Sequence, residues 1–337
     1  MSEISLTASM RSNLLSLQNT QSLMDQTQER LSTGKKVNSA IDNPSSYYTA
    51  QSLNNRASDL SALLDSMGQA IQTIQAADEG IEAITDFASQ AKAVAQSAAD
   101  STDAEERASY MEQFNNILKQ IDGIAKDSGY KGVNLLDGGT LTVKFNEKGD
   151  SKLEITGKPA DTTGLELDDA AGWGLSATGQ SKLEALNTAK DNLAKAQNGR
   201  VDAGGGGDYT SEELKKQDIE AKQGALDTAQ QAYDAQLELD IKAGAAKIEE
   251  AITAVDGAIS TLRNWASEFG NNYSIVQSRE SFTENLINVL TEGADKLTLA
   301  DMNEESANML ALQTRQQLAI NSLSLASQAA QSVLQLF

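Results

Sequence analysis

The sequence predicts a mainly α-helical fold: a long antiparallel helical rod or coiled coil with both chain ends paired, a small β-hairpin region, and an inserted helical outer domain. Three observations predict it. Apolar residues recur at heptad spacing along both ends of the 337-residue chain and along two long middle segments. Two prolines and 4% aromatic residues suit long helices better than a β-sandwich. One pair of short segments alternates with period two, which is the strand signal.

The C-terminal stretch, residues 306–337, carries one charged residue, Arg315, and has no glycine or proline. Its apolar and small residues fall on alternating steps of four and three. The seam is Met302, Ser306, Met309, Gln313, Gln316, Ile320, Leu323, Ser327, Ala330, Leu334 and Phe337. Such a helix needs a partner for its apolar face.

The N-terminal stretch supplies a matching seam. It consists of Met10, Leu14, Leu17, Gln21, Met24, Gln28 and Leu31. Because glutamine interrupts both seams, the two helices together bury little apolar area, and an isolated pair of this kind is marginal in water. We expect the termini to form one coiled coil whose outer faces need neighbouring subunits. Two ordinary surface helices of a globular domain are the alternative.

Composition excludes several function classes. The chain has no cysteine and no histidine, so Cys–His catalysis, imidazole acid–base chemistry and Cys/His zinc sites are ruled out. The net charge of −21 lies in the middle: residues 61–305 hold 21 basic and 43 acidic side chains, whereas residues 1–60 hold five of each. An acidic middle argues against nucleic-acid binding. We expect no membrane-spanning segment, no cleaved signal peptide, no cofactor and no metal site.

A short linker follows the first helix. Its residues are Ser32, Thr33, Gly34, Lys35, Asp42, Asn43 and Pro44. Gly34 should end the first helix, and the proline should hold Asn43 extended as the next helix opens. That helix should run to about Asp100, weakly broken by Gly68 and Gly80.

The next elements follow in order. Asp103 and Glu106 should cap a helix that Gly129 ends. Residues 140–145 and 152–156 alternate with period two around a turn at Gly149, which predicts a β-hairpin.

Residues 180–241 should form a helical hairpin. One helix should span 180–198, glycines 204–207 should form its tip, and a second helix should restart at 211. The glycine run has no preceding strand and no following Lys-Ser/Thr, so it is not a phosphate loop. A separate long helix should then begin near 248 and run antiparallel to the 45–100 helix.

Four motifs in order carry a resemblance to a known family. They are ERLSTGKKVNSA at 29–40, AVAQSAADST at 93–102, GYKGVNLLDG at 129–138 and LASQAAQSVLQLF at 325–337. The chain resembles the bacterial flagellins over about residues 1–157 and 245–337. Residues 166–243 fall where flagellins carry a variable outer insert.

The resemblance implies a filament subunit of the bacterial flagellum, extracellular, exported unfolded and assembled at the tip. It implies an inner-tube domain of residues 1–44 with 301–337, an outer-tube rod domain of 45–165 with 244–300, and a solvent-facing insert of 166–243. The implied partners are further copies of the chain, hook-associated junction and cap proteins, and an export chaperone. The expected polymerisation interface is Met10, Leu14, Leu17, Met24, Leu31, Ile320, Leu323, Ala330, Leu334 and Phe337.

Three alternatives to a filament subunit are a hook–filament junction protein, an enzyme and a generic coiled-coil scaffold. A hook–filament junction protein shares the Ser-Thr-Gly-Lys linker, but the ending 331–335 favours a filament flagellin. An enzyme is disfavoured because paired carboxylates such as Asp168 and Asp169 lack any nucleophile–base arrangement. A generic coiled-coil scaffold is the third alternative.

One region departs from flagellins that the Toll-like flagellin receptor detects. Where those carry a key arginine, this chain has Ser89, followed by Gln90, Lys92 and Gln96. We therefore expect weak recognition by that receptor.

Overall fold

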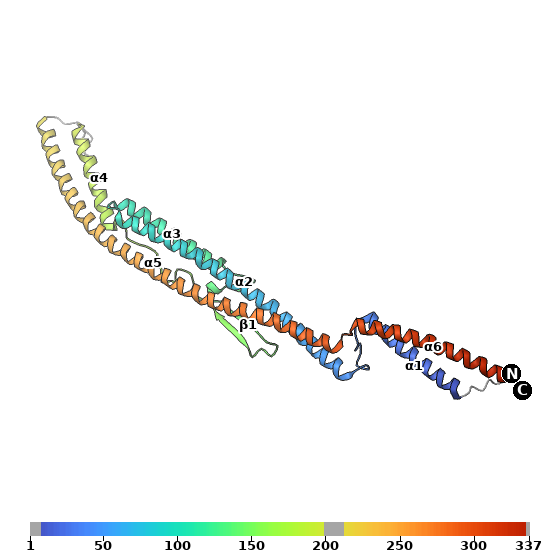
Figure 1. Ribbon diagram of the computed structural model, residues 1–337. Helices are drawn as coiled ribbons and strands as arrows, with labels where there is room; N and C mark the ends of the chain where they lie inside the picture. The colour runs from blue at the N-terminus through green and yellow to red at the C-terminus, as the bar shows by residue number, and fades with distance from the viewer. Residues whose placement is uncertain (1–7, 199–211, 335–337) are drawn as a thin grey trace. The chain divides into compact units, whose positions relative to one another are not determined.

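The computed structural model describes residues 8–198 and 212–334. Within them lie six α-helices, a short 3-10 helix and a two-stranded sheet (Figure 1). The bounds are α1 Ala8–Thr33, α2 Pro44–Asp100, α3 Ala104–Asp127, η1 Leu135–Asp137, β1 Thr140–Lys144, β2 Lys152–Thr156, α4 Ala177–Gln197, α5 Glu212–Thr298 and α6 Met302–Leu334. The mainly α-helical prediction with a small hairpin is confirmed.

The chain divides into two compact units. Unit 1 comprises Met1–Asp65, Asn146–Gly149 and Glu280–Phe337, and unit 2 comprises Ser66–Phe145 and Asp150–Arg279. The long helices α2 and α5 contribute to both units. The three-part division into inner, outer and inserted domains stays a prediction.

Unit 1 contains the paired chain ends. Helices α1 and α6 lie side by side (Figure 1). A second helix pair in this unit has a small core in which Ala57 and Leu60 of α2 meet Leu290 of α5. Arg56 Nε and Glu147 Oε1, 2.8 Å apart, attach the turn of the hairpin to α2.

Unit 2 buries apolar side chains from α2, α3 and α5. Its largest fully buried side chains include Trp173, Phe114, Phe269, Ile74 and Leu136. Gly80 does not interrupt α2; a Cβ there would fall 2.6 Å from Leu136 Cδ1 and still closer to Ser128. The glycine therefore lets η1 and the end of α3 pack directly on α2.

The cap of α3 differs in one detail from the prediction. The Asp103 carboxylate accepts hydrogen bonds from the amides of Glu105 and Glu106, as predicted. The Glu106 carboxylate, however, accepts from the Ser101 hydroxyl at 2.8 Å rather than from the Asp103 amide. The Asp103 amide donates instead to Ser101 Oγ at 3.1 Å, so it does not need the Glu106 carboxylate as an acceptor. Helix α3 ends at Asp127, with Ser128 rather than Gly129 as its C-cap.

The predicted β-hairpin is present, and its register places Thr140 opposite Thr156 and Lys144 opposite Lys152. Val143 and Ile155 are each 1% exposed, so one face of the hairpin is part of the unit 2 core. Arg279 lies over the ring of Phe145, 5.3 Å from its centroid, at the end of β1.

The predicted break between an insert helix and a second long helix near residue 244 is wrong, because α5 is continuous from Glu212 to Thr298. Gly244 lies inside it, where a Cβ would come within 2.5 Å of the Trp173 carbonyl. The glycine is therefore a close-packing position rather than a helix end. The predicted glycine tip, 204–207, lies outside the described residues.

Candidate functional site

The pair formed by α1 and α6 is antiparallel. Arg30 Nη1 and Glu305 Oε1 form an ion pair at 2.9 Å, and the Glu305 side chain is 9% exposed. Farther along, Gln316 Nε2 donates to Gln21 Oε1 at 2.8 Å. These two links join the end of α1 to the start of α6 and the middle of one helix to the middle of the other. The predicted pairing of the chain ends is confirmed.

The contact face of α1 keeps half of the predicted seam. Met10 is buried, and Leu17, Met24 and Leu31 are half-buried, as the heptad spacing indicates. Between these residues the contact face is formed by Asn13, Thr20 and Thr27, whereas the predicted Leu14, Gln21 and Gln28 are exposed.

The physical reason for this shift lies in the threonines. The Thr20 hydroxyl donates to the Ser16 carbonyl at 2.8 Å, so this small side chain is buried with its hydrogen bond satisfied on its own helix. A buried glutamine would need partners from the other helix for its whole amide. Gln21 stays at the exposed edge and bonds Asp25 and Gln316. Leu14 is 39% exposed.

The contact face of α6 shifts in the same way. It consists of Glu305, Met309, Leu312, Gln316, Ala319, Leu323, Ala326 and Ser327, of which Met309, Gln316, Leu323 and Ser327 belong to the predicted seam. Leu323 is half-buried as predicted, but Ile320 is 51% exposed and lies off this face. The side chains of Ala330 and Leu334, and all of Phe337, lie outside the described residues.

The most informative feature of α6 is a second apolar face, which the single-seam reading missed. Leu310, Leu318 and Leu325 are 65%, 63% and 68% exposed. At 100° per residue they fall within an arc of about 80°, centred opposite the face that contacts α1. We call these three residues the outer leucine stripe. Their spacing of eight and seven residues in a nearly uncharged helix could have indicated it from sequence.

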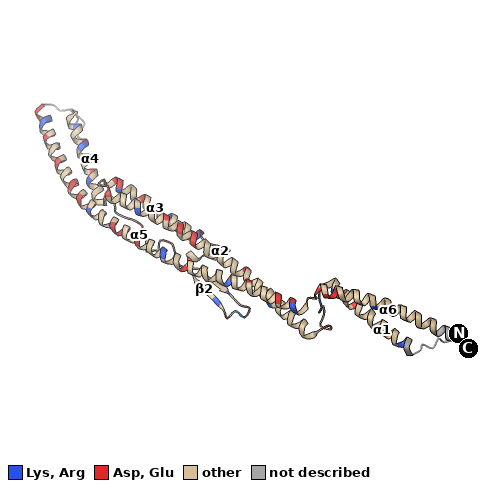
Figure 2. Ribbon diagram, in the orientation of Figure 1, with Lys and Arg blue, Asp and Glu red and all other residues tan. Residues whose placement is uncertain are grey.

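Few charges accompany this stripe. Along most of α1 and α6 the ribbon carries few blue or red residues (Figure 2), and Arg315 is the only charged residue of 306–337. Leu15 and Leu23 of α1 are also exposed. Isolated exposed leucines are ordinary, but an aligned set on a helix with few charges is typical of an interaction surface.

The linker lies against the junction between α5 and α6. The amides of Lys36 and Val37 donate to the Thr298 carbonyl at 2.8 and 3.3 Å, and the Ala300 amide donates to the Gly34 carbonyl at 3.0 Å. Gly34 takes a φ of +70°, as expected of a residue that ends a helix. Asn43 caps α2 by accepting from the Ser46 amide at 3.1 Å.

Asp42 organises the rest of the linker. Its Oδ2 accepts from the amides of Asn38 and Ser39 at 3.0 and 2.9 Å, and from the Ser39 hydroxyl at 3.2 Å. The Ser39 and Asn38 amides lower the pKa of the Asp42 carboxyl, although desolvation opposes them. Lys35 and Thr33 are exposed at the start of the linker, as is Ser32.

This network should depend on pH. The pKa of the Asp42 carboxyl is lower in the folded chain than in an unfolded aspartate, where it is about 4. The ionised carboxylate therefore stabilises the turn fully at pH values above about 4. This stabilisation is lost as the pH falls through the lower pKa of the folded chain. The amide proton shifts of Asn38 and Ser39 should titrate with a midpoint below about 4. In Asp42→Asn they should not titrate there. A midpoint at or above the free aspartate value in the native chain would show that the carboxylate does not hold the turn.

The predicted receptor region lies on α2 in unit 2. Ser89, Gln90 and Gln96 are exposed, and the Ser89 hydroxyl donates to the Thr85 carbonyl at 2.9 Å. Lys92 Nζ pairs with Asp256 Oδ1 of α5 at 2.6 Å. The cation of this region is therefore engaged within the chain.

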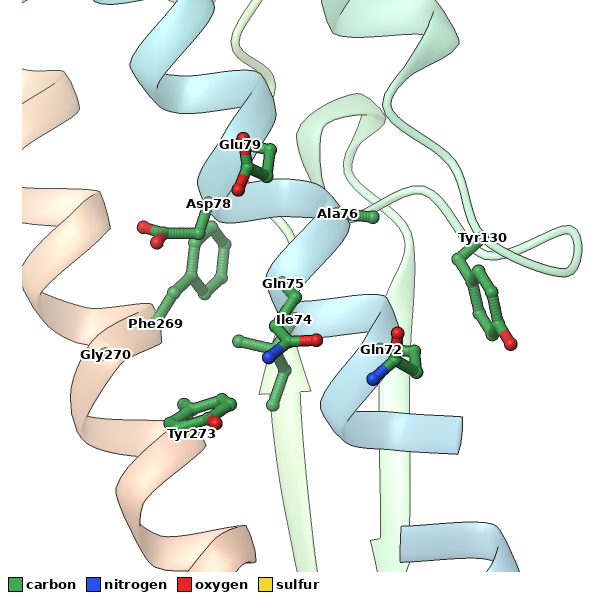
Figure 3. Close-up of a pocket in the computed structure, with 10 residues that line it drawn as sticks. All are labelled: Gln72, Ile74, Gln75, Ala76, Asp78, Glu79, Tyr130, Phe269, Gly270 and Tyr273. Carbon is green, nitrogen blue, oxygen red and sulfur yellow. The ribbon is translucent and has the colours of Figure 1, made fainter. Parts of the chain in front are cut away.

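A pocket of about 600 Å³ lies between α2, α5 and Tyr130 in unit 2 (Figure 3). Phe269 and Tyr273 line it from α5, whereas Asp78 and Glu79 contribute carboxylates from α2. In Figure 3 the Asp78 side chain points towards α5.

Two further observations concern other kinds of site. Within residues 8–198 and 212–334, no three acidic side chains gather as a metal site would require. No helix in the described part of the chain has the length and apolar character of a membrane span.

Two family models match the chain. Residues 4–140 match the bacterial flagellin N-terminal helical region, and residues 252–337 match the bacterial flagellin C-terminal helical region. The matched ranges include α1, α2 and α3 at one end and α6 at the other. They leave unmatched the segment that holds α4 and the first part of α5.

Relatives are similar over nearly the whole chain. Flagellin C of Rhizobium meliloti (strain 1021) is 26% identical and covers 93% of this chain and 92% of its own length. A flagellin of Brucella melitensis biotype 1 is 27% identical over 100% of this chain and 99% of its own. Flagellin FljM of Caulobacter vibrioides is 26% identical, covering 96% and 95%.

Proposed function

The chain belongs to the bacterial flagellin family and is a filament subunit of the bacterial flagellum, and on this premise we propose how it assembles. The outer leucine stripe, Leu310, Leu318 and Leu325, binds neighbouring subunits in the filament. The shared face of α1 and α6 holds the two chain ends together within one subunit. The expected interface residues divide accordingly: Leu14 and Ile320 join the contacts between subunits, and Met10, Leu17, Met24, Leu31 and Leu323 serve the pair inside the subunit.

The observation that carries this proposal is the exposure of the stripe. Burying a leucine side chain stabilises a contact by roughly 1.5–3 kcal/mol. Every subunit of a helical polymer repeats the same contact, so modest burial per subunit supports a long assembly. Because α6 carries few charges, two copies can meet along it without adding electrostatic repulsion at this contact.

A second surface of unit 1 suits the outer contacts of the same polymer. Phe282 and Val289 of α5 are 59% and 63% exposed and lie seven residues apart, on one flank of the helix. We propose that residues 1–44 with 301–337 form the inner tube and residues 45–165 with 244–300 the outer tube. In this arrangement residues 166–243, which carry a net negative charge, face solvent.

Membership of the flagellin family also supports specific partner proteins. We propose that hook-associated junction and cap proteins contact the ends of the polymer and that an export chaperone binds the free subunit. The subunit leaves the cell through the flagellar organelle, without a cleaved signal peptide. It is a structural protein and not an enzyme. The hook–filament junction alternative is not favoured, since the matching models and relatives are flagellins.

Sedimentation tests the function directly. Purified subunits with filament seeds should form material that pellets, depolymerises on heating and shows helical filaments in electron micrographs. A preparation that stays monomeric with seeds, at concentrations where another flagellin polymerises, would contradict the proposal.

The receptor region yields a separate prediction. An arginine can donate several hydrogen bonds in a fixed fork, and Ser89 has one hydroxyl that is already bonded to Thr85. The native chain should signal weakly through the Toll-like flagellin receptor in a cell reporter assay, and Ser89→Arg should raise its potency. Native potency equal to that of a strongly recognised flagellin would refute the prediction.

A further inference from the structure

The linker between α1 and α2 presents a large apolar side chain to solvent. Ile41 is 93% exposed, more than any other large apolar residue whose side chain the structure describes. Seven residues later, in the second turn of α2, Tyr48 is 61% exposed. Neither residue belongs to the seams of α1 and α6.

Both residues are held in place by neighbouring groups. The Ile41 amide donates to Ser39 Oγ at 3.3 Å, and the adjacent Asp42 amide donates to the Ser39 carbonyl at 3.2 Å. With the Asp42 carboxylate bound to Asn38 and Ser39, hydrogen bonds fix the backbone on both sides of Ile41. The Tyr48 ring packs edge-on against Tyr47, with centroids 5.6 Å apart.

This arrangement is that of an interface anchor. An apolar side chain on a pre-organised turn loses little conformational entropy when a partner covers it. Aromatic residues on rigid supports are common among the residues that contribute most to binding. A turn that had only to connect two helices would need neither the isoleucine nor its exposure, and a polar residue at position 41 would serve equally well.

We propose that Ile41 and Tyr48 anchor a contact with a second copy of the chain in the filament. The charge distribution favours this occupant: residues 1–60 carry five basic and five acidic side chains, so two copies meet here without the repulsion of the acidic middle. The turn also belongs to unit 1, the unit that carries the outer leucine stripe. This inference rests on the proposed function, and it adds an anchor outside the terminal helices.

Site-specific thiol labelling tests the contact, because the native chain has no cysteine. In Ile41→Cys, the maleimide reaction should be fast in the monomer and at least about tenfold slower in filaments, as a covered side chain requires. Val37→Cys is the matched control, since Val37 is buried within the subunit and should react slowly in both states. An Ile41→Cys thiol that reacts equally fast in monomer and filament overturns the proposal.

Assembly energetics give a second readout. Ile41→Asp should raise the critical concentration for seeded polymerisation at least about tenfold, Ile41→Leu should leave it nearly unchanged, and neither should alter the monomer's thermal unfolding. An unchanged critical concentration for Ile41→Asp overturns the anchor role while leaving the proposed function intact. If the native chain itself forms no filaments, the proposed function fails first, and this inference fails with it.

Discussion

Replacing Leu318 by aspartate should abolish seeded polymerisation, or raise the critical concentration at least about 100-fold, without destabilising the free subunit. Leu318 is 63% exposed and contacts solvent in the subunit, so the monomer loses little. In the filament the same position would place a charge without a partner in an apolar contact, which costs several kcal/mol in addition to the lost leucine burial. Each 1.4 kcal/mol is tenfold in affinity, so the effect should be large.

The control puts the same charge elsewhere on the helix. Gln313 is exposed and lies on the flank of α6 rather than on the stripe. Gln313→Asp should polymerise within a few-fold of the native chain. Circular dichroism of both monomers gives the unfolding midpoint, and sedimentation gives the critical concentration. Equal critical concentrations for the two variants would show that the stripe faces solvent in the filament.

Trp173→Ala, unlike Leu318→Asp, should severely destabilise the free subunit. Trp173 is 1% exposed and packs on Phe114 with ring centroids 5.1 Å apart. Removing a buried tryptophan typically costs about 3–5 kcal/mol, because it leaves a cavity that close-packed neighbours fill only in part. For a unit of this size the unfolding midpoint should fall by roughly 6–20 °C. The Asn115–Ala170 hydrogen bonds, at 2.7 and 2.9 Å, hold the loop before Trp173 and limit its collapse.

The chain contains a matched control for this substitution in its only other tryptophan. Trp265 of α5 is half-buried, so Trp265→Ala should destabilise unit 2 clearly less. Thermal unfolding followed at 222 nm compares the two. A smaller loss for Trp173→Ala than for Trp265→Ala would mean that the segment around Trp173 is not part of the unit 2 core.

The role of Trp173 was not predictable from sequence. Residues 157–178 read as a loop, because no periodicity of two or 3.6 residues runs through them. Their order comes from tertiary contacts: Asp240 of α5 accepts from the amide and hydroxyl of Ser176, each at 3.0 Å, and backbone packs on Gly244. Burial raises the pKa of Asp240, but hydrogen bonds from Gln236 and Ser176 outweigh it, so the net pKa is lowered.

The helical elements were predictable to the extent that local signals define them. Gly34, Asn43 and Pro44 set the linker, and period-two alternation set the hairpin. Heptad spacing predicted that α1 and α6 pair, but it placed some residues on their shared face that are exposed, such as Leu14, Gln21 and Ile320. From Leu17 to Met24 the seam can pass through Gln21, four residues on, or through Thr20, three residues on, and both paths fit a heptad. Thr20 takes the buried position because its hydroxyl is hydrogen-bonded on its own helix, which a pattern of apolar residues does not reveal.

The continuity of α5 shows the same limit. The sequence predicts a separate helix from about residue 248, and Gly244, just before it, lowers helix propensity by about 1 kcal/mol. The close approach of the Trp173 backbone makes it a packing requirement instead. Likewise, a single heptad seam accounts for part of the face of α6 that contacts α1 and leaves out the outer leucine stripe.

We expect α6 to be completed only by contacts with other subunits, and amide hydrogen exchange in monomer and filament measures this. We predict that the amides of residues 310–325 exchange at least about 100-fold more slowly in filaments than in monomers, because an isolated, weakly apolar helix pair opens easily. Amides of residues 74–84, in the core of unit 2, should be protected in both states and serve as the reference. Equal and strong protection of 310–325 in monomer and filament would contradict the account, since α6 would then need nothing beyond its own subunit.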